Sequence, residues 1–327
     1  MAIMSYIQAV TTALREEMLR DEKVFILGED VGKKGGVFKA TDGLYEEFGP
    51  DRVLDTPLSE SAIAGVGIGA AMYGMRPVAE MQFADFIMPA VNQIISEAAR
   101  IRYRSNNDWS APITIRAPYG GGVHGALYHS QSVEAVFANQ PGLKIVMPST
   151  PYDVKGLLKA AIRDNDPVLF FEHKRLYRLI KGEVPEDDYI LPIGKADVKR
   201  EGEDITVITY GLGVHFALQA AEKLAEDGIE SHILDLRTVY PLDQQAIIEA
   251  ATKTGKVLLV TEDNKEGSVI SEVAAIIAEN CLFDLDAPIM RLAGPDVPAM
   301  PYAPTMEKFF MISPEKLEKA MRDLAEF

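Results

Sequence analysis

Glu60 is one of a few residues whose type and position could do chemistry. It follows Asp55-Thr56-Pro57-Leu58-Ser59, directly after a short strand predicted over 52–54. Pro57 would end that strand, and Ser59 belongs to the residue types that cap helix N-termini. Glu60 would then lie in the first turn of a helix, near the positive end of the helix dipole. Position alone favours an ordinary surface glutamate that stabilises this dipole.

Two histidines, His124 and His129, lie in a glycine-rich segment that follows another predicted strand. The segment begins with Gly120-Gly121-Gly122, and glycines let a loop approach a ligand closely. Histidines in such a loop suit proton transfer near neutral pH. Metal ligation is a second interpretation, but no cysteine or acidic cluster lies beside them. A pair of ordinary loop histidines is the third.

The segment Phe83-Ala84-Asp85-Phe86 follows Glu80-Met81-Gln82 at the end of a third predicted strand. An aromatic ring after a strand end can stack on a flat heterocycle. Taken on its own, core packing of the two phenylalanines is the simpler interpretation.

The motifs of common self-sufficient sites are absent from the sequence. There is no Walker A loop, Cys-x-x-Cys, His-Glu-x-x-His or Gly-x-Ser-x-Gly. The segment Gly65-Val66-Gly67-Ile68-Gly69 superficially resembles a dinucleotide-binding loop, but position 70 is Ala and the segment lies inside a helical pattern. We interpret these glycines as small residues that allow close packing of the helix.

Short β-branched or aliphatic segments alternate with longer helical patterns along the first part of the chain. The predicted strands are 24–27, 52–54, 77–81, 113–116, 144–147 and 168–171. The predicted helices are 5–20, 59–74, 86–104 and 151–164. This alternation predicts an α/β architecture with a largely parallel sheet. Several candidate residues then follow the carboxyl ends of strands, where such sheets bind ligands.

The pattern pauses over 174–203, a charged segment with several Pro and Gly residues that we interpret as a linker. Asp243 and Ser313-Pro314 are expected to open two helices beyond it. The sequence thus predicts two α/β domains, 1–190 and 200–327. The strands predicted beyond the linker are 205–210, 230–234, 256–260 and 289–292, and the helices are one that ends near 227, 243–253, 267–280 and 314–325.

The composition is that of a soluble globular protein, with 47% hydrophobic and 25% charged residues. The net charge of −16 argues against a nucleic-acid-binding protein, because such proteins are usually basic. It suits solubility or a face for a basic partner segment.

The single cysteine and the hydropathy pattern indicate in which cellular compartment the protein is expected. Cys281 cannot form an internal disulfide, and we expect it to fill a small apolar space at a helix end. No apolar segment approaches the roughly 20 residues of a spanning helix, and the N-terminus does not resemble a signal peptide. We therefore expect a cytoplasmic protein with no membrane partner.

Taken together, these residues resemble a known family, the β subunits of thiamine-diphosphate-dependent 2-oxo acid dehydrogenases. The resemblance covers the whole chain and implies a transketolase-like pyrimidine-binding domain followed by a transketolase C-terminal-type domain. It also implies an α2β2 heterotetramer with each cofactor at an α/β interface. The segments that carry it are 27–31, 55–60, 82–86, 124–132, 159–167, 236–243 and 293–298.

The resemblance implies roles for the candidate residues. Glu60 matches the family glutamate that exchanges a proton with the aminopyrimidine ring of thiamine diphosphate. This exchange favours the imino tautomer, which removes the thiazolium proton. Phe86 matches the aromatic residue that stacks on the pyrimidine, and His129 matches the histidine implicated in proton transfer and acyl transfer to lipoamide. Further positions lining the pocket are Gln82, Leu58 and Glu29.

The family also implies a structural potassium site. An oxygen-only site suits a hard cation that dehydrates easily. Position 166 is Asp where relatives often carry Asn, and either side chain offers an oxygen. The implied ligands, mostly through backbone carbonyls, are Ile113, Ala161, Ile162, Asp164 and Asp166.

The sequence lacks the Gly-Asp-Gly segment through which such enzymes usually hold the diphosphate and magnesium. The resemblance therefore implies that an α subunit binds the Mg²⁺, across a large interface. The expected reaction is oxidative decarboxylation of a branched-chain 2-oxo acid, with acyl transfer to the lipoyl group of a dihydrolipoyl acyltransferase. The segments 83–86 and 125–131 look closer to that subfamily. Pyruvate and acetoin dehydrogenases are alternatives, and a non-catalytic scaffold that docks the acyltransferase core is a third possibility.

Overall fold

The computed structural model describes residues 1–327, which form two units. The first comprises Met1–Tyr119 and Val136–Ile193, and the second comprises Gly120–Ala135 and Gly194–Phe327. The glycine-rich segment with the two histidines therefore groups with the second unit, although it follows a strand of the first.

The first unit is built on a sheet whose strands run parallel. Within the unit they lie in the order β6-β7-β5-β4-β2-β3, so strands that are consecutive in sequence are joined by crossovers. The prediction of a largely parallel sheet is confirmed. The strands are β2 (Val24–Gly28), β3 (Val53–Asp55), β4 (Arg76–Glu80), β5 (Thr114–Tyr119), β6 (Lys144–Val146) and β7 (Val168–His173).

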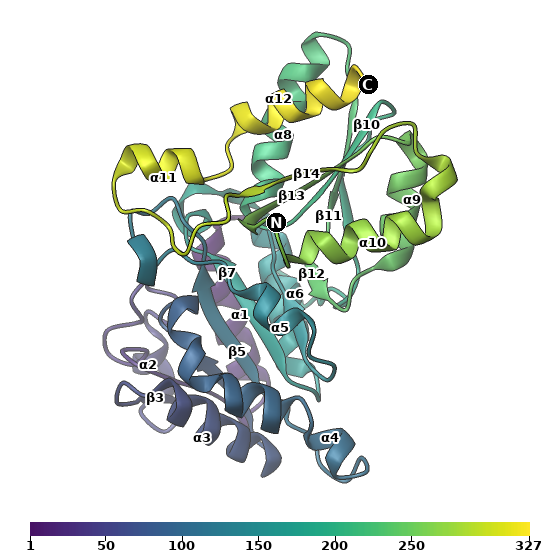
Figure 1. The fold of residues 1–327 in the computed structure, drawn as a ribbon. Helices are drawn as coiled ribbons and strands as arrows, with labels where there is room; N and C mark the ends of the chain where they lie inside the picture. The colour runs from purple at the N-terminus through teal and green to yellow at the C-terminus, as the bar shows by residue number, and fades with distance from the viewer. The chain divides into compact units, whose positions relative to one another are not determined.

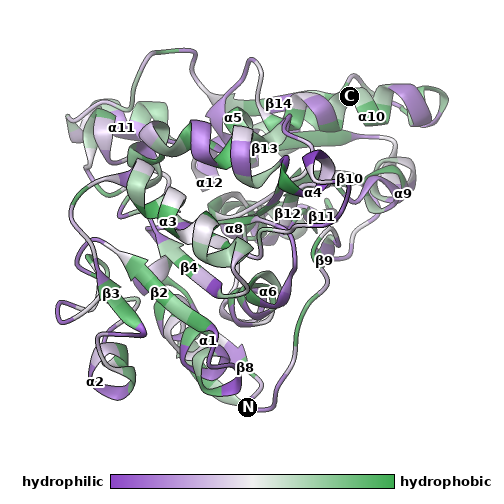
Figure 2. Ribbon diagram, turned by 90° about the horizontal axis from the view of Figure 1, so that it is seen from below, coloured by the Kyte–Doolittle hydropathy of each residue, from purple (hydrophilic) through white to green (hydrophobic).

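Helices cover both faces of this sheet. On one face α1 (Tyr6–Arg20) packs against α6 (Pro151–Arg163), and on the other α3 (Glu60–Met72) packs against β4 (Figures 1 and 2). Strand β2 is buried along its whole length and is mostly hydrophobic in Figure 2, as a strand between two helix layers must be. Side chains cap α1 and α6, through Ser5 and Thr150 respectively.

The predicted helix over 86–104 is wrong as one continuous element. The chain instead forms a 3₁₀ helix, η1 (Ala84–Ala90), a π-helix, η2 (Gln93–Ala98), and a short helix, α4 (Ile101–Arg104). Pro89 lies inside η1, where it lacks the N–H that a regular helix would use. This irregular path places Phe86 in η1.

The predicted linker over 174–203 is wrong in part. It contains α7 (Leu176–Leu179), followed by β8 (Lys181–Val184), which pairs antiparallel with β1 (Ala2–Ser5) in the first unit. Its last part forms β9 (Asp197–Arg200), which pairs antiparallel with β11 (Ser231–Asp235) in the second unit. These strands are short and polar, so they lack the hydrophobic pattern that marks the central strands.

The second unit has a sheet in the order β14-β13-β10-β11-β9, parallel except for β9. The helix pairs α8–α12 and α9–α10 lie on either side of it (Figure 1). Asp243 caps α9 and Ser313 caps α12, as expected. The elements are β10 (Ile205–Thr209), α8 (Leu212–Glu226), α9 (Gln244–Thr254), β13 (Val257–Asn264), α10 (Val269–Cys281), β14 (Met290–Gly294) and α12 (Pro314–Ala325).

Short elements complete the chain. Cys281 ends α10 and is fully buried, which confirms its expected packing role. None of the helices is both long enough and apolar enough to cross a membrane. The short elements are α2 (Leu44–Phe48), η3 (Ala126–Tyr128), α5 (Glu134–Ala138), β12 (Thr238–Tyr240), η4 (Leu282–Asp284) and α11 (Pro304–Phe310).

Candidate functional site

Glu60 begins α3, just beyond the carboxyl end of β3. It is half-buried, and no side chain of the described residues donates a hydrogen bond to its carboxylate. Ser59 occupies the N-cap position, but its side chain makes no capping bond, so that part of the prediction is wrong. The Glu60 carboxylate therefore lies at the positive end of a helix with its hydrogen-bonding capacity unused.

Glu29 lies beside Glu60, on the segment that follows the neighbouring strand β2. Burial raises the pKa of Glu29, and the nearby carboxylates of Asp30 and Glu60 raise it further. Gln82 donates a hydrogen bond of 3.4 Å to the Glu29 backbone carbonyl. Three predicted site residues are thus gathered at the carboxyl edge of the sheet, whereas Leu58 is 70% exposed.

Phe86 belongs to a chain of aromatic contacts. Its ring packs edge-on against Phe83 with centroids 5.4 Å apart, and Phe83 packs in the same way on Phe38 at 5.3 Å. Phe38 in turn contacts Tyr177 at 5.3 Å. Helix α3 adjoins η1 through the Ser61 hydroxyl, which donates to the Pro89 carbonyl at 2.5 Å. The element that begins with Glu60 therefore packs directly against the element that carries Phe86.

A buried ionic triad, which the sequence analysis missed, lies under this edge of the sheet. Arg116 on β5 donates to Glu80 on β4 and to Glu172 on β7, and the Tyr177 hydroxyl also donates to Glu172. Burial raises the pKa of Glu80, although Arg116 opposes this, and burial together with Glu172 raises the pKa of Tyr177. Charged residues inside otherwise apolar strands were the available signal.

The loop that carries both histidines is held by carboxylates of the second unit. Glu262 accepts the Gly121 N–H at 2.5 Å. Glu307 accepts the N–H groups of Gly122 and His124 at 3.1 Å each, and its other oxygen lies 2.5 Å from Nδ1 of His124. His129 is half-buried in this unit. The described residues include no group of three or more His, Cys, Asp or Glu side chains suited to a metal ion, so the metal interpretation of the loop gains no support.

A second buried acid lies where this loop ends. Burial raises the pKa of Glu134 to about 8, and the charge of Asp263 adds to the effect. The Tyr210 hydroxyl donates to Glu134 at 2.8 Å and contacts the Thr261 hydroxyl at 2.7 Å. Burial also raises the pKa of Asp263, to about 6. A protonated Glu134 is therefore the form that the folded second unit prefers near neutral pH.

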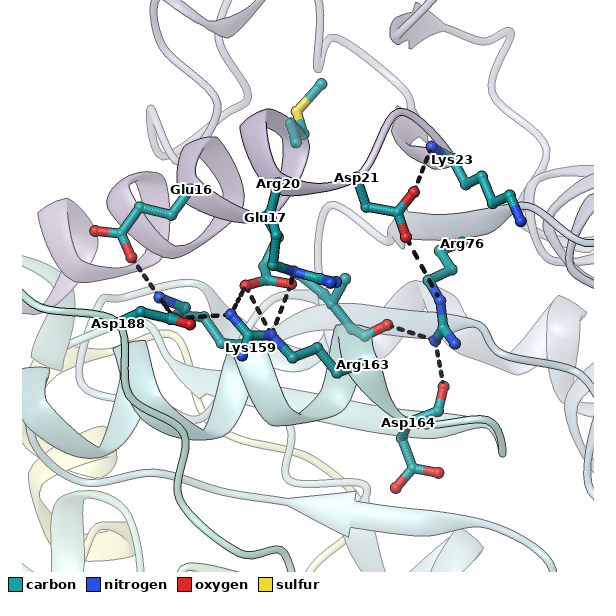
Figure 3. Close-up of polar contacts among 12 residues, drawn as sticks. Glu16, Glu17, Arg20, Asp21, Lys23, Arg76, Lys159, Arg163, Asp164 and Asp188 are labelled. Atoms are coloured by element: carbon teal, nitrogen blue, oxygen red, sulfur yellow. Dashed lines mark hydrogen bonds and ion pairs between the residues drawn. The ribbon is translucent and has the colours of Figure 1, made fainter.

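The five residues of the predicted potassium site lie at the C-terminus of α6 and on the segments after it and before β5. The Ile113 carbonyl accepts the Val168 N–H at 3.0 Å. Arg76 Nη1 donates to the Ile162 and Asp164 carbonyls at 3.0 and 2.8 Å (Figure 3). Each of these carbonyls keeps a second lone pair, so the oxygen donors suit a cation of the potassium type.

The two carboxylates of this segment are already neutralised by basic side chains. Lys144 Nζ lies 2.6 Å from the Asp164 carboxylate, and Arg102 Nε lies 2.5 Å from that of Asp166. The Asp166 N–H also donates to the Asp164 carboxylate at 2.9 Å. A cation here would therefore depend on the carbonyl oxygens more than on these side chains.

An ionic network fixes α6 against α1 (Figure 3). The buried Glu17 accepts three hydrogen bonds from the Arg163 guanidinium. Nε donates to the two carboxylate oxygens at 3.0 and 3.1 Å, and Nη2 donates to Oε1 at 2.6 Å. Lys159 lies 2.5 Å from both Glu16 and Asp188, and bonds from Arg163 and Lys159 lower the pKa of Asp188. The network positions the end of α6, which carries two of the predicted potassium ligands, Ala161 and Ile162.

Both units match described family models. Residues 3–180 match "Transketolase, pyrimidine binding domain", and residues 194–317 match "Transketolase, C-terminal domain". Among solved structures, the chain resembles "Split gene transketolase, inactive beta4 tetramer" with a TM-score of 0.80 and 23% identity, over 99% of this chain and 98% of that one. At that identity the likeness shows the fold alone.

Relatives with established names cover nearly all of the chain. The 2-oxoisovalerate dehydrogenase subunit beta of Bacillus subtilis (strain 168) is 83% identical over 327 residues, which is 100% of both chains. The pyruvate dehydrogenase E1 component subunit beta of the same organism is 52% identical over 90% of this chain and 91% of its own. The corresponding subunit of Staphylococcus epidermidis (strain ATCC 35984) is 48% identical over the same shares. The chain therefore belongs to the family of 2-oxo acid dehydrogenase β subunits, which is built from these two transketolase-type domains.

Proposed function

We propose that this chain is the β subunit of a thiamine-diphosphate-dependent dehydrogenase that oxidatively decarboxylates branched-chain 2-oxo acids such as 3-methyl-2-oxobutanoate. The observation that carries the proposal is the 83% identity to a 2-oxoisovalerate dehydrogenase β subunit, against 52% to a pyruvate dehydrogenase β subunit from the same organism. Pyruvate therefore ranks below branched-chain substrates.

The residues at the edge of the first sheet fit the pyrimidine half of the cofactor. Glu60 offers a carboxylate with no competing partner, and Phe86 offers an aromatic ring on the adjoining element. When bound, thiamine diphosphate supplies the nucleophilic carbon that attacks the substrate's keto group. Glu60 would hold and exchange a proton at the pyrimidine nitrogen, and Phe86 would stack against the ring. Gln82, Leu58 and Glu29 would line the same pocket.

His129 is the second proposed catalytic residue. Its loop is held in place by Glu262 and Glu307, so a proton donor on it would have a defined position. Its role would be proton transfer near neutral pH and delivery of the acyl group to the lipoyl arm.

The other partners of this subunit follow from the part of the cofactor site that its sequence lacks. The sequence has no Gly-Asp-Gly segment, so an α subunit would hold Mg²⁺ and the diphosphate in an α2β2 heterotetramer. The lipoyl-bearing dihydrolipoyl acyltransferase would receive the acyl group, in the cytoplasm. We also propose that residues 1–190 and 200–327 form the two domains of the subunit. The proposed potassium ligands remain Ile113, Ala161, Ile162, Asp164 and Asp166.

The decisive experiment is Glu60→Gln in the enzyme assembled with its α subunit. We expect kcat for decarboxylation to fall by about 10²–10⁴, because the amide cannot exchange the proton. Glu46→Gln is the matched control, because Glu46 is an exposed glutamate in the first turn of α2. Activity of Glu60→Gln close to that of wild type would refute the catalytic assignment and leave the scaffold role.

The substrate is tested separately with wild-type enzyme. We expect kcat/KM for 3-methyl-2-oxobutanoate to exceed that for pyruvate, although an apolar pocket distinguishes each methylene by only about 1–3 kcal/mol. A higher kcat/KM for pyruvate would reject the branched-chain assignment.

A further inference from the structure

The loop over 120–130 holds its shape by unusual backbone conformations. His124 and Ala126 have φ of 57° and 54°, in the left-handed region that non-glycine residues rarely adopt. Such conformations persist only where the surroundings over-determine them. Apart from the short turn η3 (Ala126–Tyr128), the loop has no regular secondary structure to provide that constraint.

Glu307 on α11, more than 180 residues further along the chain, constrains the conformation of this loop. Its side chain is buried, with 3% of the residue exposed. One carboxylate oxygen accepts the N–H groups of Gly122 and His124, and the other lies 2.5 Å from Nδ1 of His124. A single carboxylate thus fixes two backbone amides on either side of Val123 and also the side chain of a residue with strained φ.

The neighbouring contacts show how closely this loop fits the segment before and after Glu307. A Cβ atom at Gly121 would lie 2.6 Å from Met300 Cε and 2.8 Å from Met311 Sδ. An apolar pocket of about 610 Å³ is lined on one side by Ala126 and Leu127 and on the other by residues of 295–310. The loop therefore rests on this segment along much of its length.

The constraint extends to His129 through tight local packing. A Cβ atom at Gly125 would lie 2.7 Å from both the Cβ and the carbonyl oxygen of His129. The His129 N–H also donates to the Ala126 carbonyl at 3.4 Å. Because Gly125 directly follows His124, a change in the conformation of His124 would displace the backbone of His129.

We propose that Glu307 is a positioning residue for this reaction, and that its carboxylate sets the loop conformation that presents His129. The inference rests on the catalytic role proposed for His129. Glu307 itself touches neither the substrate nor the cofactor in this proposal. It acts through the two amides of the loop, and the His124 imidazole adds a second, weaker constraint because its side chain is largely exposed.

The test compares Glu307→Ala, Glu307→Gln and Lys308→Ala in the assembled holoenzyme. Gln keeps an oxygen that can accept both amide hydrogens but loses the ionic contact with His124, whereas Ala loses both. Lys308 is exposed on the same helix and serves as the control. Hydrogen exchange at residues 120–130 reports the loop directly, and kcat with lipoyl-domain acceptor and KM for 3-methyl-2-oxobutanoate report its function.

We expect Glu307→Ala to speed exchange at Gly122 and His124 and to lower kcat by about 10²-fold, with KM nearly unchanged. Glu307→Gln should recover most of the protection and activity, and Lys308→Ala should match wild type. Unchanged exchange in Glu307→Ala, or faster exchange with unchanged kcat, would overturn the proposal. If Glu307→Ala does not fold, Glu307→Asp decides, because its shorter side chain should reach the amides of Gly122 and His124 less well. Faster exchange at these amides together with a lower kcat supports the proposal, and wild-type values of both overturn it. Failure of the proposed function would instead appear as wild-type enzyme that does not decarboxylate the substrate, while the exchange data would remain interpretable.

Discussion

Arg116 and Glu172 form a two-pronged ion pair across neighbouring strands inside the sheet of the first unit. Nε and Nη2 of Arg116 lie 2.6 and 2.7 Å from the two oxygens of Glu172, and neither side chain is exposed. Burial lowers the pKa of Arg116, but Glu172 and Glu80 outweigh it and raise that pKa above its ordinary value. The pair ties β5 to β7 below the edge that carries the proposed cofactor residues.

We therefore expect Arg116→Met to be severely destabilising. The substitution leaves the carboxylates of Glu80 and Glu172 buried without a cation, a change that typically costs about 3–5 kcal/mol. Urea denaturation of the two proteins measures the difference in free energy of unfolding. Arg104→Met is the control, because the exposed pair of Arg104 with Glu97 should contribute only about 0–1 kcal/mol. Equal effects of the two substitutions would contradict the importance of the buried pair.

Glu134 predicts a pH dependence of stability. Its pKa is raised from 4.5 to about 8 in the folded protein, mainly by burial. Between these values the folded state holds a proton that the unfolded state has lost, so stability falls as pH rises. Glu134→Gln removes this group, and we expect its Tm relative to wild type to increase steadily from pH 5 to pH 8. The contribution of one such group is at most about 1.4 kcal/mol per pH unit. A Tm difference that is constant over this range would show that Glu134 does not titrate in this way.

The fold could be predicted where the local hydrophobic pattern of the sequence matches the burial of the element. It could not be predicted where contacts with residues distant in sequence determine the secondary structure. The apolar segment before Glu29 formed the fully buried strand β2, because that strand is covered on both faces, and the end of β2 adjoins the end of the edge strand β3. The segment 86–104 has helical periodicity, yet Pro89 and packing against α3 break it into three pieces. Strand β8 has no hydrophobic pattern in its sequence. It forms because it pairs with the N-terminal strand β1, and local sequence does not encode that pairing.

The candidate site could likewise be predicted only where its residues follow strand ends. Glu60, Glu29 and Gln82 follow strand ends, and the parallel sheet brings such ends together. The hydrogen bonds that Glu307 accepts from Gly122 and His124 join residues more than 180 positions apart, and no local spacing in the sequence encodes them. The same holds for Arg116, whose two partners lie on different strands.

The glycines of α3 test the packing interpretation of Gly65–Gly69. A Cβ atom at Gly67 would lie 2.7 Å from Ile113 Cδ1, whereas one at Gly69 would meet nothing within 4 Å. We expect Gly67→Val to destabilise the subunit by about 1–3 kcal/mol through overpacking. Gly69→Ala should stabilise it by about 0.5–1 kcal/mol, because alanine favours the helix. Thermal unfolding of both variants is sufficient, and a Gly67→Val protein as stable as wild type would disprove the packing role.

Arg76 offers a direct test of the proposed potassium site. Its Nη1 atom occupies one lone pair on each of the Ile162 and Asp164 carbonyls, and its Nη2 donates to Asn165 at 2.7 Å. In Arg76→Met those lone pairs become available to a cation, so the segment should depend more on potassium for its order. We expect the Tm gained on replacing choline chloride by KCl at equal ionic strength to be larger in Arg76→Met than in wild type. A site that saturates at 100 times its Kd would contribute about 2.7 kcal/mol. Because equal ionic strength screens surface charges alike in both salts, a general salt effect would cancel. The absence of any potassium response in both proteins would eliminate the site, and the arginine alone would then account for the order of this helix end.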